Sequence, residues 1–148
     1  ANGLGNFVQR VTTLAQIAGL TDITKATGKF EPLVAGVKQE IKTAFEQYRF
    51  DHAIESVWKL VAAGDGYVNE TKVWEPPALS GGKTQEERLA ILADLASLIL
   101  NIANLLQIFL PATAEEIVRR FGLSLADLRT SEVKPLVITK GEPLFKRL

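Results

Sequence analysis

The stretch TQEERLAILADLASLILNIANLLQIFL, residues 84–110, decides the fold of this protein. Thr84 and Glu87 have the spacing of a capping box, in which a hydroxyl and a carboxylate satisfy free amides at the start of a helix. From Leu89 to Leu110, apolar residues recur at helical spacing on almost every side of the helix. A helix that is apolar nearly all round is buried, either in a protein core or in a membrane.

A row of polar residues along this expected helix, its polar edge, indicates whether it lies in a protein core or in a membrane. The stretch is long enough to cross a bilayer. However, side chains that would be costly in lipid repeat near one face: Asp94, Ser97, Asn101, Asn104 and Gln107. We therefore expect the central helix of a bundle and no membrane, with the amides of Asn101 and Asn104 hydrogen-bonded between helices.

Three helices are expected before the central one. Apolar stripes place the first near the start of the chain and the second from about Pro32, which suits a first helical turn. Asp51 is the expected cap of the third, whose pattern loosens at residues 64–66 and can resume a last turn at Tyr67-Val68. The stripes of the first two helices are Leu4, Phe7, Val8, Val11, Leu14 and Ile17, and then Val34, Val37, Ile41, Ala44, Phe45 and Tyr48.

After the central helix, Pro111 is expected to begin a new element. Residues 113–116 have capping-box spacing and open a short helix that ends at Gly122, and Ser124 caps one further turn. Residues 133–148 are expected to be extended and anchored by Leu144 and Phe145. The sequence thus predicts an all-α antiparallel bundle of about five helices with an extended C-terminal tail, forming one domain over residues 1–148.

The composition excludes several classes of site. The chain has no cysteine and one histidine, so it has no disulfide, thiolate catalyst or Cys/His zinc site. Lys+Arg and Asp+Glu both number 17, whereas a free-standing nucleic-acid binder usually has a basic excess. The chain also lacks methionine and opens inside an apolar helical pattern, which favours a piece excised from a larger protein.

No catalytic constellation is evident in the sequence. Gly64-Asp65-Gly66 and Gly81-Gly82 lack the strand and helix that flank phosphate-binding loops. His52 has no accompanying nucleophile pattern and is interpreted as a local surface contact. We expect no catalytic residue, no metal site and no enzymatic activity in this chain alone.

Three residues suggest a different kind of site. Asn6 and Arg10 lie four apart on the first expected helix, where an amide beside a guanidinium suits base edges and phosphates. Trp74 lies among charged and proline residues, so it either folds back onto the bundle or offers a stacking face to an unpaired base. We expect Asn6, Arg10 and Trp74 to converge on one solvent-open surface at one end of the bundle if they form an RNA-binding site.

The order of several motifs resembles the anticodon-binding helical bundle of methionyl-tRNA synthetases. GNFVQR at residues 5–10 is similar to the GN-hydrophobic-V-polar-R segment that opens that bundle. Similar stretches follow nearly to the end of the chain: FDHAIESVW at 50–58, DGYVN at 65–69, TKVWE at 71–75, FLPATA at 109–114 and PLFKRL at 143–148. The sequence departs from the family where Asp65-Gly66 replace asparagine and lysine, Val73 replaces proline, and Lys146 replaces proline.

The resemblance implies a function and partners. Asn6 and Arg10 match the pair that hydrogen-bonds anticodon bases, and Trp74 matches the tryptophan that stacks on the first anticodon base. The implied partners are the anticodon loop of methionine tRNA and the catalytic domain of the same parent chain. ATP and methionine would bind that absent domain, so no cofactor is expected in this C-terminal fragment, which would be cytoplasmic.

Two alternatives remain open at this stage. One is the corresponding bundle of another class I synthetase, for valine, isoleucine, leucine or cysteine. The Lys72-Val73-Trp74 segment and the Leu144-Phe145 ending speak against it. The other is a helical interaction module that has lost RNA binding, which would fit the zero net charge and Val73.

Overall fold

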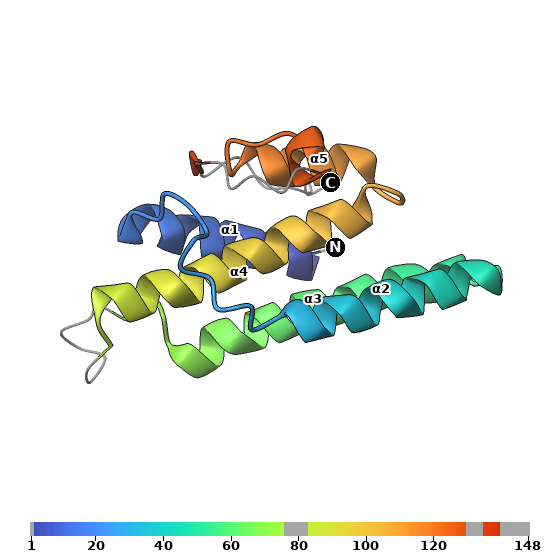
Figure 1. The fold of residues 1–148 in the computed structure, drawn as a ribbon, viewed down its shortest axis with the longest axis horizontal. Helices are drawn as coiled ribbons and strands as arrows, with labels where there is room; N and C mark the ends of the chain where they lie inside the picture. Colours follow the sequence, from blue (N-terminus) through green and yellow to red (C-terminus); the bar gives the residue numbers. More distant parts are fainter. Residues whose placement is uncertain (1, 76–82, 130–134, 140–148) are drawn as a thin grey trace.

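The computed structural model describes residues 2–75, 83–129 and 135–139, and over these it is an all-helical bundle (Figure 1). The five α-helices confirm the expected fold class, and no strand occurs in the described part of the chain. A short 3₁₀ helix, η1, follows the last of them. The helices are α1 (Asn2–Ala18), α2 (Glu31–Glu46), α3 (Phe50–Thr71), α4 (Gln85–Leu106) and α5 (Pro111–Arg119), and η1 spans Leu125–Arg129.

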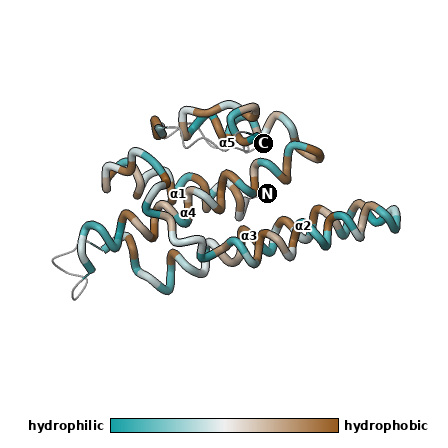
Figure 2. The backbone as a smooth tube through the Cα atoms, viewed as in Figure 1, coloured by the Kyte–Doolittle hydropathy of each residue, from teal (hydrophilic) through white to brown (hydrophobic). Residues whose placement is uncertain are grey.

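Helix α4 is the core of the bundle. The Thr84 hydroxyl accepts a hydrogen bond from the amide of Glu87 at 3.1 Å, which confirms the expected start. The helix is long and apolar enough to span a membrane, but 67% of its most apolar window is buried inside the bundle. It packs against α1, α2, α3 and α5. In contrast, α2 and α3 alternate hydrophobic and hydrophilic residues, as expected for helices with one exposed face (Figure 2).

Gly64 lets α1 approach α3 closely. The residue is buried within α3, and a Cβ atom added to it would lie 2.2 Å from Phe7 Cζ and 2.8 Å from Leu98 Cδ2. The absence of a side chain therefore makes room for the fully buried ring of Phe7. The expected loosening at residues 64–66 is wrong, because α3 continues unbroken to Thr71.

Asp94 attaches the loop between α1 and α2 to the central helix. Its carboxylate, 4% exposed, accepts hydrogen bonds from the Thr27 amide at 2.7 Å, the Thr27 hydroxyl at 2.6 Å and the Gly28 amide at 3.2 Å. Nearby, burial raises the pKa of the Tyr67 phenol, and the negative charge of Asp94 adds to this effect. One member of the polar edge thus has a structural role that its spacing did not reveal.

The side-chain amides on the same edge were expected to form hydrogen bonds to neighbouring helices, but the bonds that the structure shows lie within α4 and its C-terminal turn. Asn101 Nδ2 donates to the Ser97 carbonyl one turn earlier. Gln107 Nε2 donates to both the carbonyl and the side-chain oxygen of Asn104. The partly exposed amides find partners within their own helix, and so need none on a neighbour.

Several expected helix ends and stripe members are corrected by the structure. Helix α3 begins at Phe50, with Asp51 in its first turn and no side-chain cap at Arg49. Helix α5 already begins at Pro111, also without a side-chain cap. Ile17, in the last turn of α1, is 73% exposed. Tyr48 lies beyond the end of α2, with a φ of 58°, and is 83% exposed.

The described part of the tail, residues 135–139, has no regular secondary structure and lies on the bundle, as expected. The Leu136 amide donates to the Thr21 carbonyl at 2.7 Å, and the Thr139 amide donates to the Arg120 carbonyl at 2.8 Å. Leu136 itself is buried. The expected anchors Leu144 and Phe145 lie outside the described residues.

Candidate nucleic-acid interface

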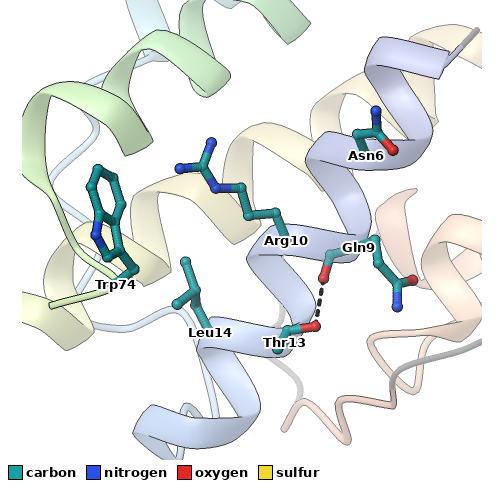
Figure 3. A pocket seen from close by; sticks show the side chains of 6 residues that line it. All are labelled: Asn6, Gln9, Arg10, Thr13, Leu14 and Trp74. Carbon is teal, nitrogen blue, oxygen red and sulfur yellow. Dashed lines mark hydrogen bonds between the residues drawn. The ribbon is translucent and has the colours of Figure 1, made fainter. Parts of the chain in front are cut away.

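One face of α1 presents polar side chains along the middle of the helix. Asn6 and Arg10 are one turn apart on this helix; Asn6 is exposed and Arg10 is partly exposed. Gln9 and Thr13 follow the same helical spacing, and the Thr13 hydroxyl donates to the Gln9 carbonyl at 2.8 Å (Figure 3). The helix therefore carries amides, a guanidinium and a hydroxyl on adjoining positions.

Trp74 is held in place by the turn that ends α3. Lys72 adopts the left-handed conformation with φ of 50°, and its amide donates to the Val68 carbonyl. Val73 is fully buried, and its carbonyl accepts a hydrogen bond from Arg88 Nε at 3.4 Å. Because Val73 is anchored in the core, the next residue, Trp74, lies at the surface and is 41% exposed.

The side chains from α1 and the turn after α3 border one open pocket of about 460 Å³ (Figure 3). It brings Trp74 next to residues that lie 60 or more positions earlier in the sequence. The structure therefore confirms that the three candidate residues lie around one open pocket, as expected. The pocket is lined by Asn6, Gln9, Arg10, Thr13, Leu14 and Trp74.

Arg10 is the centre of the contacts at this pocket. Its guanidinium carbon lies 5.2 Å from the centroid of the Trp74 ring, within cation–π distance. Its Nη2 donates to Asn69 Oδ1 at 3.1 Å, and its Nη1 lies 3.6 Å from Asp65 Oδ1. Helix α3 therefore holds the terminal nitrogens of the guanidinium while its central carbon lies over the indole ring.

Gln9 connects this face to the opposite side of the bundle. Its side-chain oxygen accepts a hydrogen bond from Arg120 Nη1 at 3.2 Å. Arg120 is 1% exposed and also pairs with Glu116 of α5 through Nε at 3.5 Å. Side chains of α1 thus bond both to α3, through Arg10, and to the residue that follows α5, through Gln9.

Five residues of the site were missed from sequence. Gln9, Thr13 and Leu14 lie three or four positions from Asn6 and Arg10, so helical periodicity could have found them. Asp65 and Asn69 carry no such local signal, because their relation to Arg10 depends on how α3 packs on α1.

The other chemical candidates give no second site. His52 is exposed, and its Nδ1 lies 3.8 Å from Glu55 in the next turn, in agreement with a local surface contact. Among the residues that the structure describes, no group of three or more histidine, aspartate or glutamate side chains could hold a metal ion.

Comparison with known proteins supports the resemblance over the whole chain. No protein-family model matches the sequence. The methionine–tRNA ligase of Bacillus subtilis is 30% identical over 165 aligned residues, which cover all of this chain and 24% of the relative. The methionine–tRNA ligase of Streptococcus pneumoniae is 27% identical with the same coverage. The chain is homologous to part of the methionyl-tRNA synthetases.

Solved methionyl-tRNA synthetases have the same fold in the matching region. The crystal structure of the Mycobacterium tuberculosis methionyl-tRNA synthetase bound by methionyl-adenylate superposes with a TM-score of 0.79 at 17% identity. This match covers 99% of the present chain and 31% of the synthetase chain. The chain spans about a quarter of the length of the curated methionyl-tRNA synthetases it matches.

Proposed function

We propose that this bundle is the anticodon-binding domain of a methionyl-tRNA synthetase and reads the anticodon of methionine tRNA. The observation that carries the proposal is the pocket in which Asn6, Arg10 and Trp74 meet. An exposed indole can stack on an unpaired base, while an amide and a guanidinium can hydrogen-bond its edge. Many single-stranded nucleic acids could bind such a pocket. The homology to methionyl-tRNA synthetases favours methionine tRNA among them.

The proposal extends to the parent protein. Residues 1–148 form a single domain of a larger cytoplasmic methionine–tRNA ligase. Its catalytic domain binds ATP and methionine, and the bundle itself contributes no catalytic residue. The coverage of only 24% of the relatives is consistent with such a division. An interaction module without RNA binding is the competing function, and titration with RNA distinguishes the two.

Replacing Trp74 with alanine should weaken binding of a methionine tRNA anticodon stem-loop by about 5- to 150-fold. This range corresponds to the roughly 1–3 kcal/mol that one stacked base contributes. Arg10→Ala should cost a similar amount and reduce discrimination against stem-loops with altered anticodon bases. Titration of each variant with cognate and altered stem-loops measures both effects.

Matched controls separate binding from folding in that experiment. Lys38 is exposed on α2, so Lys38→Ala should change RNA binding little. Trp74 is partly exposed, so its variant should retain the wild-type melting temperature to within a few degrees. A Trp74→Ala variant that melts early and binds RNA normally would contradict the RNA-binding assignment and favour the interaction module.

Binding by the isolated domain should depend weakly on salt. The formal net charge is zero, so few phosphates are neutralised and few counterions are released. We expect the slope of log affinity against log salt to correspond to about one or two phosphate contacts, roughly −0.7 for each in single-stranded RNA. Filter binding at several salt concentrations measures the slope, and tight binding with a steep slope would contradict this prediction.

A further inference from the structure

We infer that Asn69, assisted by Asp65, is a positioning residue that holds Arg10 against Trp74 before RNA binds. The inference rests on the proposed function for its role in RNA binding, but the arrangement itself can be tested without RNA. Asn69 and Asp65 lie four residues apart and so occupy one face of α3. Their side-chain oxygens face the two terminal nitrogens of the same guanidinium.

The two contacts are unequal in kind. The bond from Arg10 Nη2 to Asn69 Oδ1, at 3.1 Å, has hydrogen-bond length and fixes an edge of the guanidinium. The 3.6 Å separation from Asp65 is an ion pair between side chains that are 38% and 49% exposed. Both contacts are open to water, but only the contact to Asn69 has hydrogen-bond length, so we expect Asn69 to be the stronger positioning group.

The held orientation matters because arginine has many rotamers. A guanidinium that is fixed at its edge and lies 5.2 Å from the indole centroid is already ordered before a base arrives. Ordering a long side chain during binding would otherwise reduce the affinity. Asn69 uses only one of the five donors of Arg10, which leaves donors for a ligand.

The packing of the helices explains why α3 can supply these acceptors. Phe7 packs against Gly64, and Arg10 follows Phe7 by three residues on the same side of α1. Asp65 directly follows Gly64, and Asn69 lies one turn further along α3. The close approach at Gly64 therefore brings the end of α3 within reach of the Arg10 side chain.

Fluorescence quenching tests the arrangement without RNA. The chain has two tryptophans, so Trp58→Phe leaves Trp74 as the sole indole. In that background, Arg10→Ala removes the guanidinium and should increase quenching of Trp74 by acrylamide. Asn69→Ala should produce a large part of the same increase, and Asp65→Asn a smaller part. Gly66→Ala, on the same helix with nothing within 4 Å of the added Cβ, should leave quenching unchanged.

A double-mutant cycle tests the consequence for RNA. Asn69→Ala should weaken binding of the anticodon stem-loop by about 2- to 12-fold, the cost of ordering one long side chain. In an Arg10→Ala background the same substitution should have no further effect, because Asn69 acts through Arg10. A merely structural role would show as a lower melting temperature in both backgrounds.

The outcomes distinguish the two proposals. If Asn69→Ala leaves Trp74 quenching at the wild-type value, or weakens RNA binding equally with and without Arg10, the positioning role is wrong. If the wild-type domain does not bind the stem-loop at all, the proposed function fails, while the quenching experiment still decides whether Asn69 positions Arg10.

Discussion

The alanine variant of Asp94 should be destabilised by about 2–3 kcal/mol. The buried carboxylate accepts two hydrogen bonds from Thr27 and one from the Gly28 amide, and alanine would remove all three. Hydrogen bonds to charged groups are stronger than neutral ones, and their loss leaves donors unpaired in a partly buried loop. Urea denaturation measures the change in the free energy of unfolding.

Two further variants show whether the effect comes from these hydrogen bonds. Asp94→Asn keeps the size and an acceptor oxygen, so it should be less destabilising than Asp94→Ala. Asp22 lies in the same connector and bonds to the amide and hydroxyl of Thr24 two residues away at the surface, so Asp22→Ala should have a much smaller effect. An Asp94→Ala variant as stable as wild type would show that the loop needs no attachment to α4.

Replacing Gly64 with alanine should also destabilise the protein, by about 2 kcal/mol. The added Cβ would lie 2.2 Å from Phe7 Cζ and 2.8 Å from Leu98 Cδ2, so the core must shift. Overpacking of this kind destabilises a protein by up to about 3 kcal/mol. Alanine has a better helix propensity than glycine, which offsets about 1 kcal/mol of this cost. Phe7 is fully buried, so its ring cannot avoid the added methyl group by moving into solvent.

Gly66 provides the matched control for this substitution. It lies two residues further along α3, is exposed, and has no atom within 4 Å of an added Cβ. Gly66→Ala should therefore increase stability by up to about 1 kcal/mol through helix propensity alone. Thermal melts of the two variants should shift in opposite directions, and a shift in the same direction would contradict the packing argument.

The sequence by itself determined the helices and most of the core. The 3.6-residue period is a local property, so it predicted α4 as the central helix and placed Asn6 and Arg10 on one face of α1. Local chemistry also predicted the Thr84 cap correctly. The periodic pattern was wrong at Ile17 and Tyr48, which are both exposed. Tyr48 lies beyond the end of α2, and periodicity alone does not report where a helix ends.

The tertiary structure alone decided which side chains meet. The hydrogen bond from Arg10 to Asn69 joins residues 59 positions apart, and those from Thr27 to Asp94 join residues 67 apart. Such contacts depend on the distance and register between packed helices, and the buried Gly64 leaves room for Phe7 of α1 to pack closely on α3. Residue types could therefore indicate candidates for a base-reading site, while only the packing could place Trp74 beside Arg10 and supply its positioning partners.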